Sequence, residues 1–205
     1  MSKIKLTYFD FSGGRGEAVR IALHAAGIKF EDERLSSEQF GARREKLPFG
    51  SLPVMEVDGV TVTQSNAMLA YAGKRANLYP KDDLQAMYCD EVMGVVEDLS
   101  HYIGPTIRMS GDELKKAREA LVAGRMTVAL KGMSGLLKRG GGKYFVNNRL
   151  SVADIKVYFQ TRWLTSGALD HVPKDLVQKL APNLVEHQAR IEKESVLTAY
   201  YASRK

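Results

Sequence analysis

The residues closest to a recognisable chemical motif are the glycines that follow the first alternating stretch of the chain. Gly13, Gly14 and Gly16 stand between an expected strand that ends at Tyr8 and a pattern of helical period. A glycine-rich turn before a helix can present backbone N–H groups to a phosphate. The dinucleotide fingerprint needs a small residue three positions beyond its second glycine, but Val19 stands there, and the sequence contains no Walker A loop. A nucleotide site is therefore disfavoured.

The histidines and the cysteine are the other side chains that could do metal or nucleophilic chemistry. His24 lies in a helical pattern, and His101, His171 and His187 are scattered. None has the short spacing typical of metal ligands, so we expect no metal site. Cys89 stands in a mostly apolar helical pattern and is expected to be buried rather than reactive. As the only cysteine it cannot form an internal disulfide, which suits a reducing compartment.

The composition is that of an ordinary globular protein with a basic surface. The 205 residues are 44% hydrophobic and 26% charged, and the formal net charge is +6. A basic excess favours an anionic partner. Lysine and arginine are dispersed, however, and no zinc-finger or RNA-binding motif occurs. We therefore expect no nucleic-acid partner, and a small anionic ligand fits the charge as well.

Membrane and secretion signals are not apparent in the sequence. No apolar run approaches the ~18 residues that cross a membrane. Asp10 and the glycines interrupt the N-terminal residues too early for a secretion signal. The expected location is therefore cytoplasmic, with no membrane partner.

The elements that must position Tyr8 come from an alternation of strand and helix signals. We expect a strand over residues 4–8, a helix over 17–26, an edge-like strand over 28–35 and a helix over 36–46. Two short strands then flank Asp58-Gly59, the strongest short-range signal for a hairpin, and a helix follows.

This order, βαβαββα, is that of a thioredoxin-like α/β domain. In an open α/β sheet the ligand lies beyond the carboxyl ends of the strands, which places Tyr8 near the site. Leu52 and Pro53 precede the third strand and would lie opposite Tyr8. A cis proline there would turn backbone polar groups toward a ligand, although the sequence does not distinguish cis from trans.

From about residue 84 helical patterns dominate. The connector over 78–83 predicts a boundary between a domain of residues 1–78 and an all-helical domain of residues 84–205. Ser151 and Asp154 have the spacing of a capping box. The expected helices cover residues 84–107, 112–138, 151–166, 174–180 and 184–193.

Several segments resemble those of cytosolic glutathione S-transferases in order and spacing. They are KLTYF with GRGEAVR, LPFGSLPVMEVDG, TQSNAM and LSVADI. LTYFDF, LPFGSLPVMEVDG and TQS are most similar to the sigma class, which includes the glutathione-dependent prostaglandin D synthases. The resemblance spans nearly the whole chain and rests, in the helical half, mainly on LSVADI. It implies a thioredoxin-like glutathione-binding domain and a helical domain that contributes the pocket for a hydrophobic electrophile.

The resemblance implies that Tyr8 is the main catalytic residue. Its O–H would donate to the glutathione sulfur and so favour the thiolate. Arg15 aligns with a loop arginine near the sulfur and is the second catalytic candidate. Ser12 is the rival to Tyr8, because other classes use a serine in this loop and the loop is one residue longer than is usual in the sigma class. The loop contains no cysteine, which excludes the cysteine-using classes.

The resemblance also implies a set of glutathione-binding residues. Gln64 and Ser65 would bind the γ-glutamyl carboxylate at a helix N-terminus, a place that suits an anion. Ser65 could instead be a plain N-cap, and both roles can coexist. Leu52 and Pro53 would grip the peptide backbone of glutathione.

Three further positions depart from the usual sigma-class pattern. Arg44 stands where a lysine is usual for the glycyl carboxylate and could bind it through two N–H groups. Phe40 stands where a tryptophan is usual, and Ser51 replaces a longer polar residue. We expect glutathione contacts that are altered and weaker.

A homodimer is the remaining implication. Asp98 matches the acid that reaches the amine of glutathione bound to the other subunit, and Glu97 is the alternative if the register shifts. The implied activity is attack of the glutathione thiolate on an electrophile, as in detoxification, or isomerisation through a glutathione adduct. The alternative is a non-catalytic relative, such as a crystallin-like structural protein or a ligand carrier. The joint presence of Tyr8, Arg15, Gln64-Ser65 and Asp98 argues against it.

Overall fold

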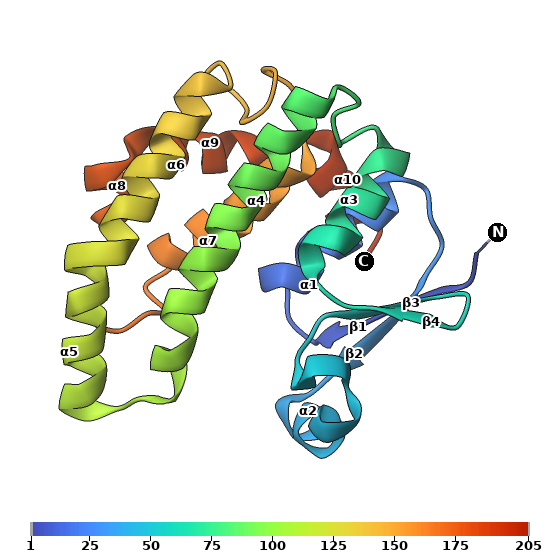
Figure 1. The fold of residues 1–205 in the computed structure, drawn as a ribbon, viewed down its shortest axis with the longest axis horizontal. Coiled ribbons are helices and arrows are strands. Elements are labelled where there is room, and N and C mark those ends of the chain that lie inside the picture. The colour runs from blue at the N-terminus through green and yellow to red at the C-terminus, as the bar shows by residue number, and fades with distance from the viewer. Residues whose placement is uncertain (1, 205) are drawn as a thin grey trace. The chain divides into compact units, whose positions relative to one another are not determined.

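The computed structural model describes residues 2–204, which form two compact units. The first unit comprises the chain up to Tyr79 together with the segment from Ser195 onward, and the second comprises Pro80–Glu194. Figure 1 labels the helices and strands of both units. The domain bounds of 1–78 and 84–205 stay a prediction. Contacts in the structure group the segment from Ser195 onward with the first unit.

A mixed sheet of four strands is the centre of the first unit. Its strands are β1 (Ile4–Phe9), β2 (Glu31–Leu35), β3 (Val54–Val57) and β4 (Val60–Val62), in the order β2-β1-β3-β4. β1 and β2 are parallel, whereas β1–β3 and β3–β4 are antiparallel. The expected order of elements and the Asp58-Gly59 hairpin are confirmed.

Three helices follow the strands of the first unit in turn: α1 (Gly14–Ala25), α2 (Ser37–Arg43) and α3 (Ser65–Ala76). α1 and α3 pack against each other on one face of the sheet, and α2 lies on the other side (Figure 1). Buried apolar side chains fill the space between the sheet and the two helices, among them Leu6 and Met68.

Two predicted bounds differ from the structure: the start of α1 and the start of β2. α1 begins at Gly14, not at residue 17, because its first turn contains glycines that a propensity pattern disfavours. β2 begins at Glu31, not at residue 28, because the Ile28 N–H still bonds to the Leu23 carbonyl and closes the end of α1. The α2 helix continues into two short 3₁₀ turns, Arg44–Lys46 and Pro48–Gly50.

The regular elements of the second unit are helices, and an isolated β-bridge joins Val146 to Arg149 in a loop. Its longest regular helix, α4, covers Asp83–Ile103 and leads through a 3₁₀ turn, Gly104–Arg108, to the rest of the unit. The helices that follow are α5 (Gly111–Leu121), α6 (Thr127–Arg139), α7 (Val152–Thr165), α8 (Leu176–Leu180) and α9 (Pro182–Ile191).

α5 and α6 form one continuous helical stretch with a π-helical turn, Val122–Met126, between them. Gly124 within this turn has φ −118° and ψ −105°, outside the helical region. By length and composition alone Gly111–Arg139 would be able to cross a membrane, contrary to the expectation that no apolar run is long enough. A single helix of this kind argues little for a membrane, because core helices of globular proteins pass the same test.

The last helix, α10 (Ser195–Ala202), is one that the sequence analysis did not predict. It packs against α1, where the rings of Tyr200 and His24 meet edge to face with centroids 5.6 Å apart. Leu197 and Tyr200 are buried there. The C-terminal segment thereby becomes part of the unit that contains Tyr8.

The predicted capping box at the start of α7 is confirmed and is fully buried. The Asp154 carboxylate accepts from the Ser151 N–H at 2.8 Å, the Ser151 hydroxyl at 2.7 Å and the Phe145 N–H at 2.9 Å. His187 Nε2 lies 2.9 Å from the same carboxylate. One side chain therefore joins the helix start to the preceding loop and to α9.

Replacing Asp154 by alanine should lower the free energy of unfolding by about 3 kcal/mol or more, because it leaves buried N–H groups without acceptors. Asp175→Ala is the matched control, since Asp175 forms an exposed ion pair with Lys179 and should change stability by less than about 1 kcal/mol. Urea unfolding followed by circular dichroism measures both. Equal effects for the two variants would contradict the structural role given to Asp154.

Candidate active site at the carboxyl end of the first strand

The sheet topology brings four predicted site segments to one edge. In the antiparallel register Thr7 pairs with Val54, so Tyr8 at the end of β1 comes next to Pro53 at the start of β3. β4 runs back toward the same edge and leads into Gln64 and α3. The first strand, the proline segment, the start of α1 and the start of α3 therefore meet where the ligand of an open α/β domain is expected.

Tyr8 is almost completely buried, with 5% of its surface exposed, and its hydroxyl accepts a hydrogen bond from the start of α1. The Arg15 N–H, in the first turn of α1, donates to the Tyr8 Oη at 3.2 Å. With this lone pair engaged, the phenolic O–H is left to donate elsewhere. Burial raises the pKa of Tyr8, although the N–H groups of Arg15 and Gly16 oppose this shift. The phenol therefore stays protonated at neutral pH and is a donor.

The glycine loop makes room for Tyr8 itself. Gly14 has φ +64°, and a Cβ atom there would lie 2.6 Å from the Tyr8 Oη. A Cβ at Gly16 would lie 2.2 Å from Cγ and Cδ1 of the ring. Real atoms do not approach so closely, so only glycine lets α1 pack on the tyrosine at these positions. The loop thus has a packing reason that requires no phosphate.

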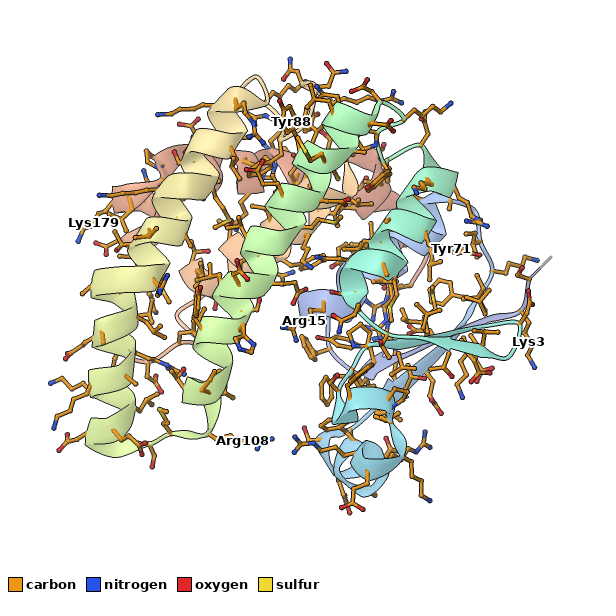
Figure 2. All side chains as sticks on the ribbon, in the orientation of Figure 1. Lys3, Arg15, Tyr71, Tyr88, Arg108 and Lys179 are labelled. Carbon is orange, nitrogen blue, oxygen red and sulfur yellow. The ribbon has the colours of Figure 1, made fainter. Side chains whose placement is uncertain are left out.

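Ser12, the rival of Tyr8, is exposed, and its hydroxyl is engaged by another part of the chain. The Nη1 atom of Arg204 donates to the Ser12 Oγ at 3.1 Å. The Arg15 side chain begins at the start of α1 (Figure 2) and is half-buried. Of the two hydroxyls in this segment, the Tyr8 hydroxyl is the one that receives the Arg15 N–H.

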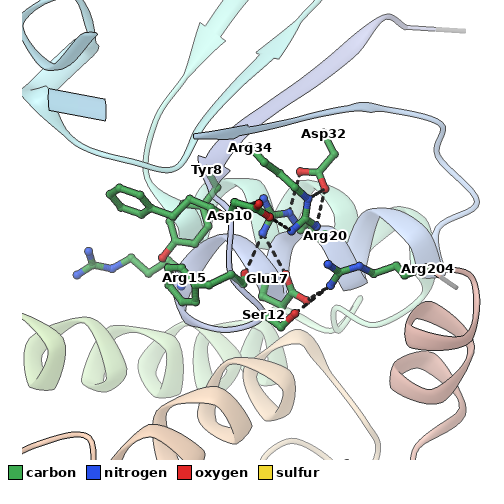
Figure 3. Close-up of polar contacts among 11 residues, drawn as sticks. Tyr8, Asp10, Ser12, Arg15, Glu17, Arg20, Asp32, Arg34 and Arg204 are labelled. Carbon is green, nitrogen blue, oxygen red and sulfur yellow. Dashed lines mark hydrogen bonds and ion pairs between the residues drawn. The ribbon is translucent and has the colours of Figure 1, made fainter. Parts of the chain in front are cut away.

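Arg20 is a site-supporting residue that the sequence analysis missed. Its side chain is fully buried and donates to the Asp32 carboxylate at 2.8 Å and the Glu17 carboxylate at 3.0 Å. It also donates to the carbonyls of Phe9 and Phe11, at 3.2 and 3.4 Å (Figure 3). Its position between two apolar residues on the buried face of an amphipathic helix was the available signal.

The proline segment and α2 form a small apolar cluster around Tyr8. Leu52 and Tyr8 are buried in it, and Phe40 packs against it. Phe40 meets the Phe9 ring edge to face, with centroids 5.1 Å apart. The peptide bond between Leu52 and Pro53 is cis. Phe40 therefore anchors α2 to the end of β1, which is a role independent of any ligand.

The remaining predicted contacts of the first unit surround this cluster. Ser51 is exposed with an extended backbone, φ −143° and ψ 161°. Arg44 is exposed, and its Nε donates to the Gly50 carbonyl at 3.3 Å. Its guanidinium therefore stays at the surface, where an anion can reach it.

At the start of α3 the structure corrects one detail of the sequence analysis. Gln64, not Ser65, is the N-cap residue, and its backbone has φ +70°, a conformation unusual for a residue with a side chain. Ser65 is the first helical residue and is 4% exposed. The interpretation of Ser65 as a plain N-cap is therefore wrong, and its hydroxyl lies in the first turn of the helix.

The two acidic candidates of the second unit differ in their surroundings. Asp98 lies on α4 and is exposed. Glu97 next to it forms an ion pair with Lys156 of α7, whose side chain is buried. Because Glu97 is engaged within its own unit, Asp98 is the better candidate for a contact outside it.

Metal and thiol chemistry find little support in the described chain. Among residues 2–204 no three His, Cys, Asp or Glu side chains are grouped closely enough to hold a metal ion. Cys89 is buried, as predicted, and burial raises the pKa of its thiol to about 12. A thiol with such a pKa is not a reactive nucleophile at neutral pH.

Comparisons with known proteins agree with this architecture. The family model described as glutathione S-transferase, N-terminal domain, matches residues 4–74, and the one described as glutathione S-transferase, C-terminal domain, matches residues 97–204. Glutathione S-transferase 1 of Ascaris suum is 35% identical over 162 residues, which are 77% of this chain and 78% of that protein.

Two solved structures are similar over nearly the whole chain. The structure of prostaglandin synthase D of Nilaparvata lugens has a TM-score of 0.84 at 28% identity and covers 99% of this chain and 98% of that one. The sigma class glutathione S-transferase of Fasciola hepatica has a TM-score of 0.80 at 26% identity, with coverage of 100% and 97%.

The contact between Gly16 and Tyr8 leads to a test of the site's packing. Gly16→Ala should lower the free energy of unfolding by about 1–3 kcal/mol, because the new Cβ must displace the buried ring. Gly132→Ala is the matched control, since Gly132 lies in α6 with nothing within 4 Å of an added methyl group, and should raise stability by up to about 1 kcal/mol. If both substitutions stabilise the protein in urea unfolding, the close packing is wrong.

Proposed function

The chain belongs to the glutathione S-transferase family, and from this premise we propose that it binds glutathione and activates its thiol through Tyr8. The observation that carries the proposal is the hydrogen bond from the Arg15 N–H to the Tyr8 Oη near the end of β1, which leaves the phenolic O–H to donate elsewhere. Burial raises the pKa of Tyr8 above its ordinary value, so the phenol is protonated at neutral pH and its O–H can donate to a sulfur anion. The similarity of the fold to a sigma class structure supports the family assignment from which the role of Tyr8 is proposed.

The proposed chemistry begins with loss of the thiol proton to solvent. The Tyr8 O–H then donates to the thiolate, and a hydrogen bond to a charged acceptor is worth about 1.5–3 kcal/mol. That free energy corresponds to a thiol pKa lowered by about one to two units, at ~1.36 kcal/mol per unit. The sulfur attacks an electrophilic carbon, a C–S bond forms, and the electron pair of the broken bond leaves with the leaving group or stays in the adduct. In an isomerisation the C–S bond later breaks and returns the thiolate.

For glutathione itself we propose contacts along the edge described above. The first turn of α3 with Gln64 and Ser65 would hold the γ-glutamyl carboxylate, because helix N-termini favour anions. The backbone of Leu52, before Pro53, would pair with the cysteinyl part as an added strand does. Arg44 would reach the glycyl carboxylate from the surface, and Ser51 lies between these groups in sequence.

The second substrate is proposed to be a hydrophobic electrophile. Phe11 follows Tyr8 closely, with ring centroids 5.6 Å apart, and 49% of its surface is exposed. An exposed aromatic ring beside the activated sulfur favours an apolar acceptor. Conjugation and isomerisation are both compatible with this arrangement, and a similar structure is that of a prostaglandin synthase.

We also propose a homodimer in which Asp98 contacts glutathione bound to the partner subunit. Asp98 is exposed and Glu97 is paired with Lys156, which supports Asp98 as the outward contact. Phe49, in the 3₁₀ turn after α2, is 83% exposed. A large apolar ring in this position is costly in water and would be covered in a dimer.

Tyr8→Phe should reduce turnover at neutral pH by roughly ten- to a hundredfold while glutathione affinity changes little, because only the hydroxyl is lost. The loss should shrink as the pH rises, since thiolate then forms without help. Steady-state kinetics between about pH 6 and pH 9, together with titration calorimetry, are the measurements.

Ser12→Ala discriminates the rival assignment. If this variant abolishes the ultraviolet absorbance of bound thiolate while Tyr8→Phe retains it, Ser12 is the activating residue. Absence of any heat with millimolar glutathione and folded wild-type protein would reject the proposed function as a whole.

Asp98→Ala should weaken glutathione binding by about tenfold, the equivalent of one charge-assisted hydrogen bond, and leave the free energy of unfolding nearly unchanged. Asp90→Ala is the control, because Asp90 is an exposed aspartate about two turns earlier on α4. Light scattering at micromolar concentration gives the oligomeric state in parallel. A monomer with full glutathione affinity would contradict the dimer and the role of Asp98 together.

A further inference from the structure

The C-terminal segment makes a direct polar contact with the loop that follows Tyr8. Arg204 lies just beyond α10 and is 192 positions from Ser12 in the sequence. Its Nη1 donates to the Ser12 Oγ at 3.1 Å and to the Glu17 Oε1 at 2.9 Å. Figure 3 shows the guanidinium reaching these two residues from the end of the chain.

Glu17 connects this contact to the buried arginine of the site. Its side chain is fully buried, and its two carboxylate oxygens go to different cations: Oε2 lies 3.0 Å from Arg20 and Oε1 lies 2.9 Å from Arg204. Arg20 holds the carbonyls of Phe9 and Phe11. The two arginines together therefore hold three of the four residues between Tyr8 and Gly13.

The loop needs such external contacts because of its own composition. Gly13 and Gly14 connect Ser12 to Arg15, and glycine has more conformational freedom to lose than any other residue. The Arg15 N–H at the far end of this connection is the group that orients the Tyr8 hydroxyl. Fixing Ser12 and Glu17 fixes the loop on both sides of the two glycines, and thereby the position of that N–H.

We propose that Arg204 is a positioning residue, which holds the glycine loop in place and so keeps the Tyr8 hydroxyl aimed at the sulfur of the bound thiol. The part of this inference that concerns the sulfur rests on the proposed function. The part that concerns the loop rests on the contacts of Arg204 alone. The Arg204 side chain is 32% exposed, so its contact is open to solvent, whereas the Glu17 carboxylate that it neutralises is buried.

The test compares Arg204→Ala, Arg204→Lys and Arg75→Ala in the full chain. Arg204 lies over the Tyr200 ring, 5.5 Å from its centroid. Arg75 is the matched control, because it lies over the ring of Tyr71 of α3 (Figure 2) and donates to the backbone carbonyl of the same residue at the surface. Arg204→Ala should speed hydrogen exchange of the amides in residues 10–16 by roughly three- to tenfold, a range between an exposed and a buried charged contact. Arg75→Ala should leave these amides unchanged, and Arg204→Lys should restore part of the protection.

The catalytic consequence is read from the pH profile. With glutathione and a chromogenic aryl halide as substrates, Arg204→Ala should lower kcat by roughly three- to tenfold, with little change in the KM for glutathione. The apparent pKa of the bound thiol should move toward that of free glutathione. A purely structural role would lower activity without moving the pKa.

The outcomes separate the two proposals. Unchanged exchange in residues 10–16 of Arg204→Ala overturns the positioning role, whatever the activity. If Arg204→Ala exchanges faster but the wild-type protein neither binds nor ionises glutathione, the loop contact is retained and the proposed function is rejected. Faster exchange with an unchanged thiol pKa in an active enzyme rejects the link from Arg204 to Tyr8.

Discussion

The burial of Arg20 between two carboxylates is the interaction on which the site depends. A charged guanidinium with no exposed surface is tolerated only when its charge is balanced and its N–H groups are bonded, and here Glu17, Asp32 and two carbonyls of the loop do both. Apolar side chains of similar volume could replace such a cluster without loss of stability. They could not hold two backbone carbonyls, so the reason for an arginine is the shape of the loop. Its planar group with several fixed donors suits that purpose better than a lysine.

Tyr8 combines a buried ring with a hydroxyl that lies at the edge of the sheet where we propose that the ligand binds. A phenol is protonated at neutral pH even in water, and burial raises the pKa of Tyr8 further. Packing α1 directly on the ring buries the ring, and this packing is possible only because Gly14 and Gly16 lack a side chain. Glycine in a helix costs about 1 kcal/mol relative to alanine, and the buried aromatic contact offsets this cost. The first turn of α1 also supplies the Arg15 N–H, which donates to the Tyr8 Oη.

Local signals in the sequence predicted most of the fold, whereas contacts between residues far apart in the sequence were not predicted. The hairpin at Asp58-Gly59, the end of the first helix close to residue 26 and the capping box at Ser151 each depend on a few adjacent residues, and the structure confirms them. The place of Tyr8 near the candidate site followed from the rule that ligands lie at strand ends, whereas its catalytic role came from the family resemblance and stays a proposal. The contacts of Arg204 with the loop could not be predicted, because nothing in a sequence indicates which surface a short C-terminal helix will cover. α10 itself was missed because its eight residues are too few to show a clear helical period.

The course of the chain has a further consequence for how the site is assembled. The strand, loop and helix around Tyr8 belong to the first part of the sequence, but the segment from Ser195 onward belongs to the same compact unit. The buried Glu17 carboxylate acquires its second cation only when that segment is in place. The helical unit between them is therefore an insertion, in terms of contacts, within the unit that holds the tyrosine. The final geometry of the loop therefore includes contacts from the segment beyond Ser195, and the surroundings of Tyr8 draw on both parts of the first unit.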